Sequence, residues 1–216
     1  MKTCVFGGGP GINIEKAAFI ASDCDLVLAA DGGADAAVRG GVIPSKVVGD
    51  LDSISQETMQ LLKQHNVPFE VYPCEKDMSD TELCLREVSE SDEIILVCSL
   101  SGRPDHAVCN MLLALRLHEE GYNITITDGY SDFIPLCGED MISIEGIQNP
   151  DELYISLIPF TEVSGVSTEG LYYKLNDASV ECGTSYTVSN KLEEGSDAFS
   201  VSVKSGNMGV LIVPEE

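Results

Sequence analysis

The chain has 216 residues, enough for one large domain or for two modest ones that each bury a core. It carries 36 acidic and 12 basic residues, and the formal net charge of −24 opposes attraction to nucleic acid or to an anionic membrane. No apolar run approaches the roughly 18 residues that span a bilayer, and the apolar opening is far too short for a signal peptide. We therefore expect a soluble, cytoplasmic protein that binds neither nucleic acid nor membrane.

Eight cysteines are scattered along the chain, and none forms a CxxC pair. Several lie in apolar or helical stretches, where a thiol packs as a small hydrophobic side chain. We expect all of them to be reduced and structural.

Residues 1 to about 130 alternate short apolar runs with helical patterns, which is typical of βαβ units and a mostly parallel sheet. Strands are expected at Thr3–Phe6, Leu26–Ala29, Lys46–Val48, Phe69–Tyr72, Ile94–Cys98 and Ile124–Thr127. Helices are expected around Ile14–Ala21, Ala34–Arg39, Ser55–His65, Asp80–Val88 and Pro104–Glu120. Ligands of such sheets bind beyond the carboxyl ends of the strands, so the loops that follow the strands carry the candidate site.

Two glycine-containing loops follow the first two expected strands. The stretch Gly7-Gly8-Gly9-Pro10-Gly11 permits close approach of the backbone to a phosphate, but Ile12 breaks the GxGxxG spacing of a dinucleotide fingerprint. The second strand ends in Asp31-Gly32-Gly33-Ala34, an acid followed by a flexible turn into a helix. This second loop is compatible with a nucleotide contact or with an ordinary connection.

The third expected strand ends in a pair of carboxylates, Asp50 and Asp52. If the backbone stays extended beyond Val48, the two side chains project to the same side. Two nearby carboxylates repel each other unless a proton or a metal compensates them, so the pair predicts a cation site. The alternative is a turn into the next helix, with Ser53 and Gln56 as its capping box.

The fourth expected strand leads into Lys76-Asp77-Met78-Ser79-Asp80-Thr81-Glu82. Ser79 and Glu82 fit a capping box, which gives the stretch a complete structural explanation. Asp77 and Asp80 nevertheless join the two earlier acids at one sheet edge, together with one of the few lysines. This convergence favours a site for metal and phosphate.

The fifth expected strand runs into Gly102-Arg103-Pro104-Asp105-His106. Pro104 suits the first turn of the following helix. Arg103 is a rare arginine at the ligand-binding edge and is suited to binding phosphate with two parallel hydrogen bonds. His106 and Asn110 share a helical face, and a lone histidine of this kind is commonly a hydrogen-bonded structural residue.

The sequence changes character near residue 138, where the helical pattern gives way to β-rich runs separated by Gly, Asn, Asp and Ser turns. The runs are Met141–Ile144, Leu153–Pro159, Leu171–Leu175, Ser185–Val188, Phe199–Val203 and Val210–Val213. We therefore predict an N-terminal α/β domain with a mostly parallel, Rossmann-like sheet over residues 1–135. A C-terminal antiparallel β-sandwich domain follows over residues 138–216.

Taken together, these stretches resemble the thiamine pyrophosphokinase family over nearly the full length and in the expected order. The residues that carry the resemblance are Asp31-Gly32-Gly33-Ala34, Gly49-Asp50-Leu51-Asp52-Ser53, Lys76-Asp77-Met78-Ser79-Asp80-Thr81-Glu82, Gly102-Arg103-Pro104-Asp105-His106 with Asn110, Gly170-Leu171-Tyr172-Tyr173-Lys174-Leu175 and Ser189-Asn190. The resemblance implies a catalytic α/β domain that binds ATP and metal, and a β-sandwich that helps to bind thiamine. It also implies a homodimer with the substrate site at or near the subunit interface.

The implied reaction transfers the terminal diphosphate of ATP to the hydroxyl of thiamine and releases AMP, with Mg²⁺ as the cofactor. The implied metal ligands are Asp50, Asp52 and Asp80, and the implied catalytic residues are Asp50, Asp52, Asp77, Asp80, Arg103 and Asp105. The implied contacts of ATP are Asp31, Gly32, Lys76, Ser79, Arg103, His106 and Asn110, and those of thiamine are Ser167, Tyr173, Ser189 and Asn190.

The chain departs from the family pattern at a few positions. Ser79 stands where many members have Thr, which preserves the hydroxyl, and Tyr172 and Lys174 flank the aromatic Tyr173 in place of the usual residues. Two other function classes stay open: a non-catalytic regulator that binds a nucleotide or thiamine, and a metal-dependent phosphatase with an aspartyl nucleophile. Against the phosphatase, Ile54 stands where that family expects Thr or Val, and the later paired-acid motif of that family does not appear.

Overall fold

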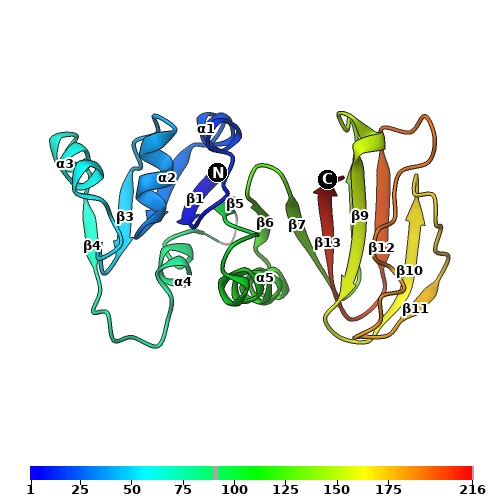
Figure 1. The fold of residues 1–216 in the computed structure, drawn as a ribbon. Helices are drawn as coiled ribbons and strands as arrows, with labels where there is room; N and C mark the ends of the chain where they lie inside the picture. Colours follow the sequence, from blue (N-terminus) through cyan, green and yellow to red (C-terminus); the bar gives the residue numbers. More distant parts are fainter. Residues whose placement is uncertain (90–91, 216) are drawn as a thin grey trace. The chain divides into compact units, whose positions relative to one another are not determined.

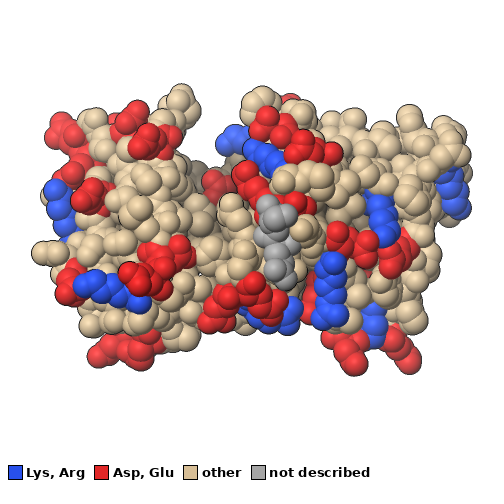
Figure 2. Space-filling model, turned by 180° about the vertical axis from the view of Figure 1, so that it is seen from behind, with Lys and Arg blue, Asp and Glu red and all other residues tan. Residues whose placement is uncertain are grey.

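The computed structural model describes residues 1–89 and 92–215. Residue 216, the last of the predicted second domain, lies outside the described residues. The chain divides into two compact units, Met1–Leu113 with Gly121–Tyr130, and Ala114–Glu120 with Ser131–Glu216. Acidic side chains are spread over the face drawn in Figure 2, in line with the net charge of −24.

The first unit is built on six parallel strands in the order β4-β3-β2-β1-β5-β6 (Figure 1). The strands are β1 Lys2–Gly8, β2 Leu26–Ala30, β3 Lys46–Gly49, β4 Phe69–Val71, β5 Glu93–Cys98 and β6 Asn123–Thr127. The helices are α1 Ile14–Ser22, α2 Gly33–Arg39, α3 Gln56–Gln64, α4 Asp80–Leu85 and α5 Pro104–Glu119, whose last turns belong to the second unit. The predicted parallel α/β architecture is confirmed.

The core of the first unit joins the sheet to helices α1, α2 and α3. Phe6, Val47, Leu62 and Val97 are almost fully buried in it. Gly33 opens α2 so close to β1 that a Cβ atom there would overlap the carbonyl oxygen of Phe6. This close approach holds the beginning of α2 against the end of β1, beside the loop that carries Asp31.

The second unit is an antiparallel β-sandwich, as predicted. One layer pairs β7 Asp132–Cys137, β13 Asn207–Pro214 and β9 Leu153–Pro159. The other has the order β11-β10-β12-β8, with β8 Asp140–Ile144, β10 Val163–Glu169, β11 Ala178–Val180 and β12 Phe199–Val203. A 3₁₀ turn, Pro150–Glu152, precedes β9. Both layers contribute to one core, in which Leu136, Leu157, Val166, Val201 and Val210 are fully buried or nearly so.

Two strands expected in this unit do not form. Leu171–Leu175 is a loop because Gly170, with φ +72°, ends β10, and only Leu171 makes an isolated bridge, to Leu192. Ser185–Val188 forms turns along the edge of β9, where the amide of Leu157 donates to the carbonyl oxygen of Thr187. Strands β7, β10 and β11 were not expected from the sequence.

Candidate active site

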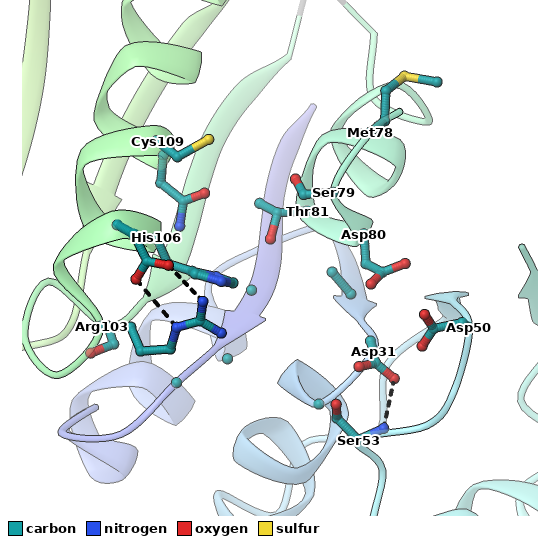
Figure 3. A pocket seen from close by; sticks show the side chains of 18 of the residues that line it. Asp31, Asp50, Ser53, Met78, Ser79, Asp80, Thr81, Arg103, His106 and Cys109 are labelled. Carbon is teal, nitrogen blue, oxygen red and sulfur yellow. Dashed lines mark hydrogen bonds and ion pairs between the residues drawn. The ribbon is translucent and has the colours of Figure 1, made fainter. Parts of the chain in front are cut away.

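A cavity of about 800 Å³ lies in the first unit, at the carboxyl ends of β1, β2, β3 and β5. The strand order reverses here, because β2, β3 and β4 extend from one side of β1 and β5 and β6 from the other. Such a reversal is where open α/β sheets bind ligands. The predicted residues that line the cavity are Asp31, Gly32, Asp50, Lys76, Ser79, Asp80, Arg103, Asp105, His106 and Asn110. Figure 3 shows Arg103 and His106 on one side of the cavity and Asp31, Asp50 and Asp80 on the opposite side.

Asp31, Asp50 and Asp80 form an acidic triad, because one carboxylate oxygen from each lies within 4.8 Å of the other two. Gly49 permits this approach: a Cβ atom there would lie 2.9 Å from Asp80 Oδ1 and 3.0 Å from Asp31 Cβ, and its φ of +146° disfavours any other residue. Asp31 itself has φ +42°, and burial raises the pKa of its carboxyl, with a smaller contribution from the charge of Asp80.

Lys76 pairs with two members of the triad. Its Nζ lies 3.2 Å from Asp50 Oδ2 and 3.1 Å from Asp80 Oδ1. Burial opposes the charged form of Lys76, but its interactions with the carboxylates of Asp80 and Asp50 raise its pKa above the ordinary value. The backbone amide of Asp52 lowers the pKa of Asp50, and Lys76 adds to that effect. Asp50 and Lys76 are therefore both charged at neutral pH.

Asp80 Oδ1 is a buried atom without a hydrogen bond among the described residues, although it is in ion-pair range of Lys76. The single charge of Lys76 does not offset three converging carboxylates, so a divalent cation at this oxygen would be favourable. Three carboxylate groups present hard oxygen donors, which are the ligands that Mg²⁺ prefers. The residues of the triad therefore fit a magnesium ion.

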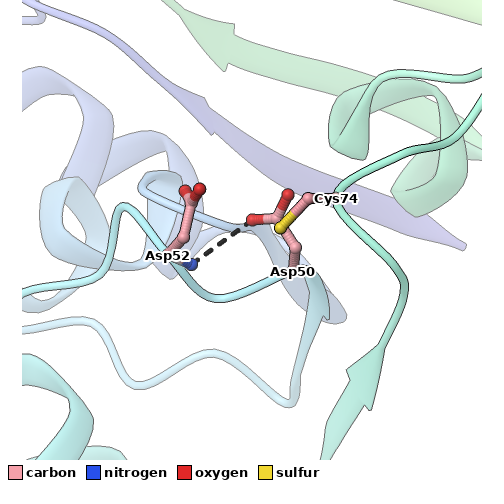
Figure 4. A group of neighbouring side chains, drawn as sticks. All are labelled: Asp50, Asp52 and Cys74. Atoms are coloured by element: carbon pink, nitrogen blue, oxygen red, sulfur yellow. Dashed lines mark hydrogen bonds between the residues drawn. The ribbon is translucent and has the colours of Figure 1, made fainter.

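Asp52 lies just outside the described lining of the cavity, and the backbone before it is turned. The sequence-based expectation of an extended backbone beyond Val48 is wrong, because Leu51 has φ +67° and the amide of Asp52 donates to Asp50 Oδ1 at 3.3 Å. Figure 4 shows Asp50 between Asp52 and Cys74, with ligand atoms of the three within 4.8 Å of one another. A turn, and not an extended backbone, thus brings Asp50 and Asp52 close together.

The helices that follow begin at serine caps. Ser79 Oγ accepts from the amide of Glu82 at 3.1 Å, which confirms Ser79 as the N-cap of α4. Ser55, and not the expected Ser53, is the N-cap of α3. Ser53 instead donates its amide to Asp31 Oδ1, at 3.4 Å, and so supports the triad. Asp77 is exposed and is absent from the described lining of the cavity.

Arg103, just before α5, and Asp105, in its first turn, form a forked ion pair. Nε donates to Oδ1 at 3.2 Å, and the second contact, to Oδ2, is 2.6 Å long. Arg103 lowers the pKa of Asp105 through this hydrogen bond. One helical turn further, Asn110 is buried and donates to Cys98 Sγ at 3.4 Å, which fixes its side chain at the cavity wall.

Sequence reasoning missed several residues of the cavity wall, among them Cys74, Met78, Thr81, Ser99, Ser101 and Cys109. Ser99 directly follows the last residue of β5, and Cys109 is one helical turn from His106. The position of Ser99 after a strand and of Cys109 near His106 on a helix could therefore have placed both at the cavity. Their side chains suggested no specific chemistry.

The four predicted thiamine contacts all belong to the second unit. Asn190 is buried, and its Oδ1 accepts from the amides of Tyr173 at 3.0 Å and Lys191 at 2.9 Å, while its Nδ2 donates to the carbonyl oxygen of Tyr173 at 2.8 Å. Ser189, with φ +59°, donates its amide to Ser156 Oγ at 2.9 Å. Ser167 lies on β10, where its Oγ accepts from the amide of Asp177.

Asn190→Ala is expected to destabilise the second unit by about 2 kcal/mol, because the amide and carbonyl of Tyr173 lose their partner. The free energy of urea unfolding measures the effect. Asn176→Ala is the matched control, since Asn176 is exposed and should change stability by less than about 0.5 kcal/mol. Equal effects of the two substitutions would show that Asn190 does not hold this loop.

Two family models match the chain. The thiamin pyrophosphokinase catalytic domain matches residues 18–126, and the thiamin pyrophosphokinase vitamin B1 binding domain matches residues 142–208. The first match contains the acidic triad, Lys76 and Arg103. The second lies within the β-sandwich.

Relatives of known name match this chain over most of their own length and nearly all of its length. The chain is 28% identical over 204 residues to thiamine pyrophosphokinase from Bacillus subtilis (strain 168), covering 93% of this chain and 94% of the relative. Its fold resembles the crystal structure of thiamin pyrophosphokinase from Geobacillus thermodenitrificans, with TM-score 0.82, 23% identity and coverage of 100% and 99% of the two chains. The structure of thiamin pyrophosphokinase from Candida albicans gives TM-score 0.79 at 16% identity, with coverage of 99% and 89%.

Proposed function

This chain belongs to the thiamine pyrophosphokinase family, and on that basis we propose that it transfers the terminal diphosphate of ATP to the hydroxyl of thiamine, giving thiamine diphosphate and AMP. The observation that supports this most is the pairing of an acidic triad with Lys76 and Arg103 around one cavity of about 800 Å³. Attack falls on the β-phosphorus of ATP, so the protein must hold the triphosphate, offset its charge and place a neutral alcohol in line.

The proposed cofactor is Mg²⁺, held by Asp50 and Asp80 with Asp31 beside them. Asp52 would assist from the far side of Asp50, where their oxygens lie within 4.8 Å. A bound magnesium ion would offset the negative charge of the phosphates. Asp50 is suited to ligation because the Asp52 amide and Lys76 keep its pKa low. Gly49 keeps the triad compact by leaving room for Asp80 Oδ1.

The proposed phosphate contacts come from both sides of the cavity, Arg103 opposite the acidic triad and Lys76 beside it. Arg103 presents a planar, permanently charged fork, and Asp105 holds that fork at the end of β5. Lys76 is the other cation of the described lining. Gly8 and Gly9, at the end of β1, let the backbone approach a phosphate closely. Together these groups bind the triphosphate and stabilise charge as the bond to the leaving AMP breaks.

We propose that residues 1–135 form the catalytic domain and residues 138–216 the thiamine-binding domain. The positions of the two family matches support a division into two domains, and the second compact unit also takes in β7 from Asp132 on. The resemblance further supports a homodimer with its substrate site near the subunit interface.

A cytoplasmic location agrees with the eight cysteines, all of which are free thiols. Among the described residues, no helix is both long and apolar enough to cross a membrane.

Tyr173→Ala is expected to raise the KM for thiamine several-fold and to change the KM for ATP less. The two neighbouring tyrosines are both exposed, and their ring centroids lie 4.9 Å apart. Lys191 Nζ lies 5.5 Å from the Tyr172 centroid, so a cation already occupies that ring. A cationic thiazolium therefore gains more from Tyr173, by about 0.5 to 2 kcal/mol.

Tyr172→Ala is the matched comparison, and steady-state kinetics with each substrate measures both variants. Equal effects on the KM for thiamine, or a larger effect at Tyr172, would show that Tyr173 does not provide the stacking face.

The decisive assay incubates the purified protein with ATP, Mg²⁺ and thiamine and measures AMP and thiamine diphosphate together. Equal amounts of both products, dependent on each of the three components, would establish the reaction. Binding of ATP and thiamine without AMP would instead identify a regulator. Phosphate release from simple esters through a trapped acyl-phosphate would identify a phosphatase.

A further inference from the structure

Three oxygen atoms surround the ammonium of Lys76 at the acidic side of the cavity. Lys76 donates to Asp50 Oδ2 at 3.2 Å and to the carbonyl oxygen of Pro73 at 3.1 Å, and its Nζ lies 3.1 Å from Asp80 Oδ1. The side chains of Lys76 and Asp50 are each only 13% exposed. Two of the three donors of the ammonium make hydrogen bonds, and the Asp80 oxygen lies in ion-pair range without a hydrogen bond among the described residues. Lys76 is thus held against the acids and does not extend into the open cavity.

Two of the three oxygens around Lys76, those of Asp50 and Asp80, belong to the triad that fits a dication. One ammonium supplies a single positive charge against three carboxylates, whereas a divalent metal supplies two and binds oxygen at much shorter distances. A metal ion bound to Asp50 Oδ2 and Asp80 Oδ1 would lie close to Nζ, and the two cations would repel each other. Metal and ammonium therefore compete for the same carboxylates.

We propose that Lys76 is a positioning residue that holds Asp50 and Asp80 together and is displaced from them when the metal binds. The inference rests on the proposed function only in treating the triad as the metal site. After displacement, the flexible four-carbon stem of Lys76 keeps its ammonium inside the same cavity, where it can turn toward a phosphate. Metal entry is in this way coupled to the supply of a second phosphate-binding cation beside Arg103.

Lys76→Met tests the competition, because it removes the charge and keeps an unbranched apolar stem. The probe is Mn²⁺ alone, titrated into nucleotide-free protein and followed by electron paramagnetic resonance. Without a competing ammonium, the Kd for Mn²⁺ is expected to fall by about fivefold or more, the range typical of coupling between two ligands. The Tm of the variant without metal should be lower than that of the parent. Adding Mn²⁺ should raise the Tm of the variant by more than it raises the Tm of the parent.

Two variants serve as controls. Lys76→Arg keeps a positive charge at the triad, so its Kd for Mn²⁺ should stay close to that of the parent and should not follow the methionine variant. Lys46→Met removes a lysine that also bridges two carboxylates, Glu70 and Glu87, at the opposite end of β3. This substitution should lower the Tm without lowering the Kd for Mn²⁺, because Lys46, Glu70 and Glu87 lie away from the triad.

An unchanged or weaker affinity for Mn²⁺ in Lys76→Met, with Lys76→Arg equal to it, would overturn the proposal. The proposal would also be overturned if Lys46→Met lowered the Kd for Mn²⁺ as much as Lys76→Met does. Formation of thiamine diphosphate by the parent protein is measured in a separate assay, which tests the proposed function independently of Mn²⁺ binding. A parent that makes this product while Lys76→Met binds Mn²⁺ no more tightly refutes the competition alone. A parent without product, in which Lys76→Met still tightens Mn²⁺, refutes the proposed function alone.

Discussion

Asp50→Asn and Asp80→Asn are each expected to lower turnover by roughly a hundredfold or more, which corresponds to about 2.7 kcal/mol of activation free energy. Both substitutions keep the shape of the side chain and remove a charged oxygen from the triad, so the proposed metal loses a strong ligand. Asp80 matters particularly because its buried Oδ1 has no hydrogen bond among the described residues. Steady-state turnover at saturating Mg²⁺, with circular dichroism as the folding control, measures the effect.

Asp52→Asn separates two placements of the metal, because Asp50 belongs to two groups of candidate ligands. If the metal lies among Asp31, Asp50 and Asp80, then Asp52→Asn should be milder than Asp80→Asn. The reverse order would place the metal between Asp50, Asp52 and Cys74. Near-parent turnover in both Asp50→Asn and Asp80→Asn would refute a catalytic role for the triad.

Much of this site could be predicted because its residues directly follow strands. The carboxyl ends of parallel strands meet at one edge, so Asp31, Asp50 and Arg103, which follow β2, β3 and β5, had to lie near one another. Local backbone conformation was less predictable. The left-handed turn at Leu51 brings Asp52 near Asp50 through an Asx hydrogen bond, and an i, i+2 spacing cannot distinguish this turn from an extended strand.

The second unit was harder to predict because side chains replace strand partners there. Leu171–Leu175 has the composition of a strand, yet the amide and carbonyl of Tyr173 are both satisfied by the side chain of Asn190, seventeen residues away. Conversely, Val163–Glu169 is rich in Ser and Gly but pairs with β11 and β12. Both outcomes depend on tertiary contacts, which override local β propensity.

Arg103→Lys is expected to lower kcat/KM for ATP by about tenfold to a hundredfold, and to change thiamine binding little. A fork that makes two parallel charge-assisted hydrogen bonds to phosphate contributes about 1.5 to 3 kcal/mol, and lysine cannot reproduce that geometry. Lysine also cannot make the two-point contact with Asp105 that holds the fork at the end of β5. The cation would therefore lose its orientation as well as one of its hydrogen bonds.

Arg86→Lys is the matched control, because Arg86 is exposed at the end of α4 and, among the described residues, forms an ion pair with Glu82 at 3.5 Å. Its kinetics should match the parent, since exposed ion pairs contribute little. ATP affinity is best measured by competition with a non-hydrolysable analogue, and thiamine affinity by calorimetry. Because the guanidinium faces the acids across the cavity, loss of ATP use with intact thiamine binding would place it on the triphosphate. Kinetics equal to those of the parent would show that Arg103 serves only its ion pair with Asp105.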